Sequence, residues 1–432
     1  MKNPPNLLDS HLTREAIAGM TTFFTMAYII FVNPAILSTE GTGMSFEGVL
    51  TATVLLSFSM TLLMGLYAKL PFAVAPGMGI NAFFAYSLIL GQKIPFATAL
   101  GIIFWAGVFF ILISVTPVRE RIAQAIPHNL RVASAAGIGI FLSFIGLKNT
   151  GLVVSDPVTF VKVGTINKFV LLSFLGMGLN LYLLRKKNPF AFLAGILVVT
   201  LLALSFGFIQ PPKEILKWPN FSTVFFKLDV ISPLKLSLLP AIISILFTDL
   251  FDSISTFIGV AHASNLKDEN GDPKNLKQGL IVDAIATMSA GLLGTSSGTA
   301  YIESSAGIEV GGRTGLTSIF TALCFLPCLF LSPLAAIVPT YATAPVLIIV
   351  GGLMFRTVHE LKLERLEDSI PAYLTIVLIP LTFSITQGIL WGFISHFVMY
   401  MLAGRRRELP KMQVALAFIS LSLLIIESLK LN

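Results

Sequence analysis

The stretch Pro71-Phe-Ala-Val-Ala-Pro-Gly-Met-Gly-Ile-Asn-Ala-Phe-Phe-Ala-Tyr86 is almost entirely apolar, yet it does not have the composition of an intact membrane-spanning helix. Pro76 removes a backbone donor, and Gly77 and Gly79 raise the entropic cost of helical backbone. We therefore predict that the first part of this segment is extended and that a helix follows it. Asn81 would lie just after the break, where helix N-terminal amides can present positive dipole ends to a ligand.

A second segment has the same character. In Gly294-Thr-Ser-Ser-Gly-Thr-Ala-Tyr-Ile-Glu-Ser-Ser-Ala-Gly307, small, hydroxylated and β-prone residues precede a helix predicted to start near Tyr301. Glu303 follows directly after this predicted break. Both segments are therefore expected to be interrupted.

The positions of the two breaks indicate an internal repeat. Gly77 and Gly298 lie 221 positions apart, and the helix-leading prolines Pro127 and Pro339 lie 212 apart. If seven spans repeat as seven, the second unit must insert upside down, and paired interrupted helices in such repeats mark a binding site near the membrane midplane. The alternative is that the glycines only allow close helix packing.

The composition places the whole chain in a membrane. Of 432 residues, 55% are hydrophobic and only 12% are charged, whereas soluble domains carry about 25% charged residues. A soluble fold, a disordered chain and a disulfide scaffold are excluded. Spans need about 20 apolar residues, and fourteen such runs lie near 16–37, 49–68, 72–91, 95–116, 130–147, 168–184, 190–209, 239–260, 279–292, 296–310, 314–332, 340–355, 370–384 and 386–403. The run 412–429, which contains Glu427, would lie in the interface or cross as a fifteenth.

The basic residues indicate the orientation. With a cytoplasmic N-terminus and alternating runs, twenty basic residues fall inside and eight outside, as the positive-inside rule expects. The inside set includes all eleven arginines, Arg14, Arg119, Arg121, Arg131, Arg185, Arg313, Arg356, Arg365, Arg405, Arg406 and Arg407. This predicts a multi-pass protein of the cell membrane. Because the cations are scattered in short loops, the net charge of +7 does not indicate a nucleic-acid partner.

Carboxylates within spans are costly and are functional candidates by default. Asp249 and Asp252 are three residues apart and share one helix face. Glu303 is the leading candidate, because a carboxylate at the start of a half-helix can accept N–H groups of a planar ring or take up a proton. Glu303 could instead cap its helix, Asn81 could be a packing amide, and one aspartate could only stabilise its neighbours.

The remaining residues provide less evidence for a functional site. Asp283, Glu309, His396 and Glu427 are expected to be structural or interfacial, and Cys324 and Cys328 to be buried thiols. A flat heteroaromatic substrate would stack on an aromatic side chain. Five aromatic residues lie near the polar candidates in the sequence and could supply one: Phe83, Phe84, Phe251, Phe257 and Tyr301. Since phosphate-loop, zinc-ligand and nucleophile-elbow patterns are lacking, we expect neither an enzyme nor a cofactor or metal.

Five blocks together resemble a known family. They are Met26-Ala-Tyr-Ile-Ile-Phe-Val-Asn-Pro-Ala-Ile-Leu37, Ala75-Pro-Gly-Met-Gly-Ile-Asn-Ala-Phe-Phe-Ala85, Phe247-Thr-Asp-Leu-Phe-Asp252, Tyr301-Ile-Glu-Ser304 and Gly311-Gly-Arg-Thr-Gly-Leu-Thr317. In order, and across nearly the whole chain, they are similar to signature blocks of the AzgA-like purine permeases. These are adenine, guanine and hypoxanthine transporters of the nucleobase/cation symporter-2 family, related to the uracil and xanthine permeases.

The resemblance implies an all-α, fourteen-span fold built as a seven-plus-seven inverted repeat, with short antiparallel strands in spans three and ten. It implies a core about 16–116 and 239–332, a gate about 130–209 and 340–403, and leaves the tail 404–432 unplaced. It also implies purine import with protons, sodium being less favoured, and often a homodimer. The substrate-binding residues expected together with it are Gly79, Asn81, Phe83, Asp249, Thr299, Tyr301 and Glu303; for proton coupling they are Asp249, Asp252 and Glu303.

Two other classes stay open. An anion transporter on the same architecture would need a cationic residue or bare helix ends at the pocket, whereas the deep ionisable groups found here are acidic. An intramembrane enzyme would need a nucleophile and base or a metal cluster, and His396 has no evident partner in the sequence.

Overall fold

The computed structural model describes residues 11–116, 127–264 and 275–428, and Arg119 and Arg121 lie outside these ranges. Within them, nine helical segments are long and apolar enough to cross a membrane. These are α1 (His11–Met26) with α2 (Ile29–Leu37), α3 (Phe46–Leu63) with its extension Met64–Ala68, α5 (Phe96–Val115), α7 (His128–Thr150), α8 (Lys168–Arg185), α10 (Leu239–Ser264), α11 (Leu276–Leu293), α15 (Thr340–Phe355) with Arg356–Glu360, and α17 (Ile385–Leu402). The chain is thus a polytopic, mostly helical membrane protein.

Shorter helices complete the described chain. They are α4 (Met78–Ala82) continued by a π-helix over Phe83–Gly91, α9 (Ala191–Ser205), α12 (Ser304–Val310), α13 (Gly315–Phe325) followed by a 3-10 turn over Leu326–Phe330, α14 (Ser332–Ala336), α16 (Leu366–Leu381) and α18 (Lys411–Ser428). Three further 3-10 turns cover Ser232–Leu234, Leu236–Leu238 and Arg406–Glu408.

The two proline- and glycine-containing segments meet each other. Strand β1 (Val74–Pro76) pairs antiparallel with β4 (Gly298–Ala300), with Ala75 opposite Thr299. Two further backbone bonds of 2.9 Å, from Gly77 N to Ser297 O and from Tyr301 N to Ala73 O, extend the pairing at both ends. Helix α4 follows β1 at once, whereas α12 starts at Ser304, three residues after the predicted start.

Strands β1 and β4 form a two-stranded ribbon, and side chains bond the backbone groups at its outer edge. Thr61 Oγ1 of α3 donates to Val74 O at 3.0 Å and accepts from Val74 N at 2.9 Å. Ser304 Oγ accepts from Ala73 N at 3.0 Å. Non-helical backbone at membrane depth is tolerated only when its polar groups are paired or face a cavity, and these hydroxyls meet that requirement.

Gly294 directs the chain into β4. It ends α11 with a φ of 90°, a left-handed conformation that side chains other than glycine disfavour. A Cβ there would also lie 2.5 Å from Val224 Cβ, so the connector before α10 closes over this turn. The position requires glycine for both reasons.

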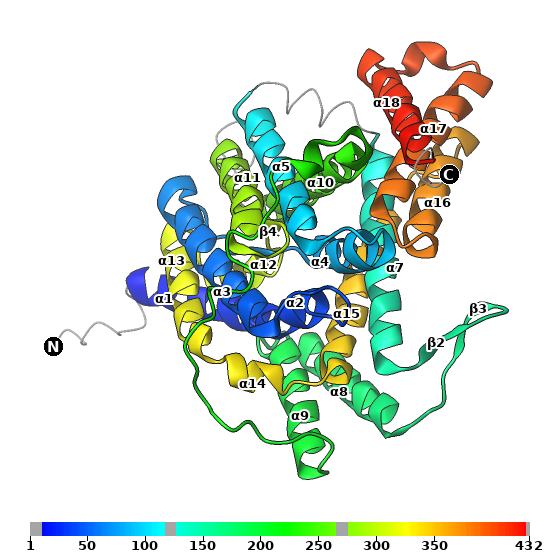
Figure 1. Cartoon of the computed structure of the whole chain (residues 1–432). Coiled ribbons are helices and arrows are strands. Elements are labelled where there is room, and N and C mark those ends of the chain that lie inside the picture. Colours follow the sequence, from blue (N-terminus) through cyan, green and yellow to red (C-terminus); the bar gives the residue numbers. More distant parts are fainter. Residues whose placement is uncertain (1–10, 117–126, 265–274, 429–432) are drawn as a thin grey trace.

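A second group of helices is centred on α7, which contacts α15, α16 and α17 (Figure 1). Helix α7 also contacts α4 and α10, and α17 contacts α10. Helices α7 and α15 approach closely where Gly139 faces Gly351. A Cβ on Gly139 would lie only 2.5 Å from the Gly351 carbonyl oxygen, so glycine is needed there. Small residues commonly allow such contacts between membrane helices.

The C-terminal tail, which the sequence analysis left unplaced, forms α18 beside α17 (Figure 1). In the turn before it, Arg405 Nη1 binds Glu367 Oε1 at 2.6 Å, and near the end of α17 the Tyr400 hydroxyl donates to Asp368 Oδ1 at 2.8 Å. The side chain of Glu427 is outside the described residues.

The loop between α7 and α8 contains a hairpin that the sequence analysis did not predict, formed by β2 (Val153–Asp156) and β3 (Phe160–Val163). Asp156 is bonded to Lys162 Nζ at 2.8 Å and accepts backbone N–H groups of Val158 and Thr159. These bonds lower the pKa of Asp156 to about 2.

Candidate functional site

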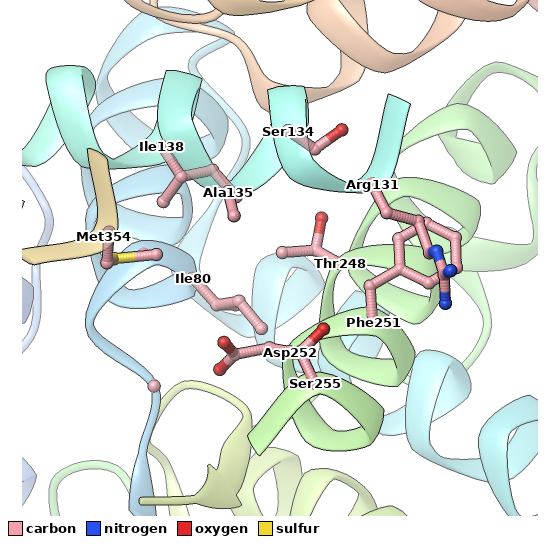
Figure 2. Close-up of a pocket in the computed structure, with 12 residues that line it drawn as sticks. Ile80, Arg131, Ser134, Ala135, Ile138, Thr248, Phe251, Asp252, Ser255 and Met354 are labelled. Atoms are coloured by element: carbon pink, nitrogen blue, oxygen red, sulfur yellow. The ribbon is translucent and has the colours of Figure 1, made fainter. Parts of the chain in front are cut away.

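A cavity of about 60 Å³ lies between α4, α7 and α10 (Figure 2). Two helices supply most of its wall, each through residues spaced three or four apart, which places them on one helix face. Its lining residues are Gly77, Gly79 and Ile80; Arg131, Ser134, Ala135 and Ile138 of α7; Thr248, Phe251, Asp252 and Ser255 of α10; and Met354 of α15.

Asp252 is the carboxylate that faces this cavity. Its side chain is half-buried, and in Figure 2 the carboxyl group points from α10 toward Ile80. Oδ2 accepts one long bond, 3.4 Å, from Thr299 Oγ1 of β4. Asp252 therefore combines a ribbon contact with an accessible acceptor.

Asp249 is held behind the cavity wall. It is fully buried, and its Oδ2 accepts from Ser297 Oγ at 2.7 Å and from Thr287 Oγ1 of α11. Its other oxygen has no partner among the described atoms. The two aspartates predicted on one face of α10 thus have different surroundings: Asp252 lines the cavity and Asp249 anchors the helix to α11 and the ribbon.

Asp283, expected to be structural or interfacial, belongs to the same polar network. It is fully buried on α11, and Ser253 Oγ donates to its Oδ2. Thr287, one turn further along α11, donates to Asp249. No described salt bridge involves these aspartates, so the network consists of carboxyl and hydroxyl groups.

Glu303 is paired with an aromatic hydroxyl. The Tyr28 hydroxyl, at the break between α1 and α2, donates to Glu303 Oε1 at 2.6 Å. Glu303 occupies the N-cap position before α12, but its side chain makes no capping bond there and is paired with the neighbouring Tyr28 instead. Tyr301 likewise turns its hydroxyl to the ribbon and donates to Pro76 O at 2.5 Å.

Asn81 and Phe83 lie in the packed layer behind the cavity. Both are almost completely buried. Asn81 Oδ1 accepts a hydrogen bond from Ser296 Oγ, which links α4 to the segment before β4. Of the predicted substrate-binding residues, Gly79 alone is among the described lining residues, while Thr299 is bonded to the lining residue Asp252.

The sequence analysis did not predict four polar residues that line the cavity, Arg131, Ser134, Thr248 and Ser255. Arg131 was counted only as an inside charge. A usable signal was present, because Arg131, Ser134, Ala135 and Ile138 have the i, i+3, i+4, i+7 spacing of one helical stripe. Thr248, Phe251, Asp252 and Ser255 repeat that spacing on α10.

Two interrupted segments that meet at a cavity, with acidic side chains in the adjoining helices, are the arrangement of a membrane transporter. The comparisons with known proteins agree with this class. The chain matches the Permease family over residues 13–390, and it belongs to that family.

Relatives are similar over nearly their whole length. The chain is 42% identical to "Adenine permease AdeP" of Escherichia coli over 406 residues, covering 94% of this chain and 91% of that protein. It is 38% identical to "Guanine/hypoxanthine permease PbuO" of Bacillus subtilis over 420 residues, covering 94% and 96% respectively.

Solved structures show the same fold at low sequence identity. The transmembrane domain of the cyanobacterial bicarbonate transporter BicA matches with a TM-score of 0.68 at 17% identity, covering 89% of this chain and 98% of that one. Murine Slc26a9, an anion transporter in the inward-facing state, matches with a TM-score of 0.63 at 10% identity, covering 94% and 69%. These matches concern the fold alone.

Proposed function

We propose that this chain transports a purine nucleobase, adenine, guanine or hypoxanthine, across the cell membrane and is not an enzyme. The relatives named as adenine and guanine/hypoxanthine permeases support this substrate class. The observation that carries the proposal is the cavity beside Asp252, which combines apolar walls with a few polar groups. Such pockets suit small, flat ligands that need both burial and hydrogen bonds.

Within this proposal, Asp252 accepts a ring N–H of the purine, and the ribbon holds Gly79 backbone against the ligand. Asn81, Tyr301 and Glu303 act on the substrate through the ribbon and the breaks that they connect. Asn81 and Glu303 bind Ser296 and Tyr28 respectively, which supports a positioning role.

The proposed architecture is fourteen crossings in two inverted sets of seven, with a cytoplasmic N-terminus. The core comprises about 16–116 and 239–332, and the gate about 130–209 and 340–403. The cavity has α4 and α10 on one side and α7 and α15 on the other, as expected if core and gate move against each other in alternating access.

Import is proposed to be coupled to protons. Asp249, Asp252 and Asp283 accept from the hydroxyl groups of Thr287, Thr299 and Ser253 respectively. Ser253 Oγ also lies 3.3 Å from Thr299 Oγ1, which links Asp283 to Asp252. Ionised carboxylates at membrane depth that have no salt-bridge partner, as is the case for these three among the described residues, are costly. Proton uptake from outside relieves that cost in the purine-loaded carrier, and the proton leaves with the purine on the inside before the empty carrier returns.

Uptake of radiolabelled hypoxanthine and adenine by cells that lack purine uptake of their own is the direct test. The chain should confer saturable uptake, and Asp252→Asn should abolish most of it at equal surface expression. Glu360→Gln, which changes an exposed carboxylate outside the site, is the matched control. If the wild-type chain neither takes up purines nor gains thermal stability from them, the proposal fails.

Anion transport is the second candidate, because Arg131 supplies the cationic lining residue that it needs. Asp252 lies in the same lining and offsets that charge. Sulfate and bicarbonate should therefore produce no thermal shift in the purified protein at concentrations where a purine does. A shift with the anions alone would favour this second candidate.

A further inference from the structure

Arg131 is an unusual member of the cavity wall. It lies in the first turn of α7, and its Nε atom is buried without a hydrogen-bond partner among the described residues. Buried donors are nearly always paired in native proteins, and an unpaired one calls for an explanation such as a missing ligand. Thr248 Oγ1, across the cavity on α10, is buried and unpartnered as well.

No salt bridge joins Arg131 to Asp252 in the described ranges. In Figure 2 Arg131 descends from α7 on the side of Phe251, whereas the Asp252 carboxyl points the other way, toward Ile80. The cavity therefore presents a donor group and an acceptor group separated by apolar wall. A neutral molecule with acceptors at one edge and an N–H at another complements this pattern.

We propose that Arg131 is a specificity-determining contact that selects 6-oxopurines over adenine. This inference rests on the proposed function. The O6 and N7 atoms of hypoxanthine or guanine are adjacent acceptors, which a guanidinium fork can bind with two hydrogen bonds. Adenine places an amino donor where O6 would be, so two donors oppose each other there. Asp252 accepts a ring N–H from either purine, so Arg131 carries the discrimination.

Competition against labelled hypoxanthine uptake tests this assignment. Arg131→Gln should raise the inhibition constant of unlabelled hypoxanthine roughly tenfold, the range that one bidentate contact supplies. That of adenine should change less than about twofold, since adenine forms no such pair. Arg185→Gln removes an exposed arginine at the end of α8 and is the charge-matched control.

A ligand-side measurement protects the test against misfolded variants. In the wild-type protein, 7-deazahypoxanthine, which lacks the N7 acceptor, should compete several-fold less well than hypoxanthine, and Arg131→Gln should erase that difference. Two results would overturn the role of Arg131 but leave the proposed function standing. They are wild-type purine uptake with an adenine preference, and an unchanged ratio of the hypoxanthine and adenine inhibition constants in Arg131→Gln. Absence of any purine uptake by the wild type would instead reject the proposed function.

Discussion

The Tyr28 hydroxyl donates a 2.6 Å hydrogen bond to Glu303 Oε1, which connects the break between α1 and α2 to the break between β4 and α12. Tyr28 is only 1% exposed. A carboxylate that accepts from a buried phenol forms a short, strong bond. This contact thus holds two irregular backbone segments at a common depth.

Replacing Tyr28 with Phe removes the donor and keeps the ring. We expect the free energy of unfolding to fall by about 1–3 kcal/mol, because a buried acceptor is left unpaired, and uptake to decrease with it. Thermal unfolding in detergent measures the first effect. Tyr67→Phe, at a half-exposed position in the extension of α3, is the control, and equal behaviour of the two variants would contradict the structural role of the bond.

Thr287 supports the aspartate network from α11. Thr287→Val keeps the side-chain shape but removes the hydroxyl that donates to Asp249 and lies 2.9 Å from Ser297 Oγ. We expect destabilisation of about 1–3 kcal/mol, measured by thermal unfolding. Thr382→Val, an exposed threonine after α16, should change stability far less. A Thr287→Val protein as stable as that control would show that the network does not depend on this hydroxyl.

Gly79 faces Ile138 across the cavity wall. A Cβ on Gly79 would lie 2.5 Å from Ile138 Cγ2, so Gly79→Ala should push α4 away from α7. We expect purine uptake to fall roughly tenfold, because an extra methyl group in a tightly packed contact typically costs about 1–3 kcal/mol. Gly79→Ala with Ile138→Ala should restore much of it, since the clashing methyl group is gone. Additive losses in the double variant would argue against direct coupling of the two positions.

The β2–β3 hairpin supplies a pH test outside the membrane. The pKa of Asp156 is lowered to about 2, with the bond to Lys162 as the largest cause. Because the folded pKa lies below the unfolded one, the stabilisation is present above about pH 4 and is lost as the pH falls toward 2. Carboxyl NMR titration should show this midpoint. Lys162→Met should raise it toward the ordinary value, and an unchanged midpoint would exclude the ion pair as the cause.

The sequence predicted the parts of the site that follow from local chemistry. Pro76 and the flanking glycines indicated the interruptions, and the acidic residues of α10 were identified because charge is rare in membrane spans. Which of Asp249 and Asp252 faces the cavity depends on the rotation of α10 against α7 and α11, and that is a property of packing. Glu303, Asn81 and the aromatic residues near them were also chosen from the sequence, and the family resemblance added Gly79.

Other features depended on contacts distant in sequence. Tyr28 was missed because its partner Glu303 is 275 residues away. Asp283 was assigned no functional role because its hydroxyl partner Ser253 lies on a different helix, 30 residues away in sequence. Arg131 was explained by the positive-inside rule, so its location in the cavity wall was not predicted from the sequence.

The pairing of β1 with β4 has a consequence for biosynthesis. Val74 is translated more than 220 residues before its partner Ala300. At roughly 5–20 residues per second, the first strand exists for about 10–45 s before the second emerges. During that interval the peptide groups that β1 later pairs with β4 have no strand partner and must be kept away from lipid.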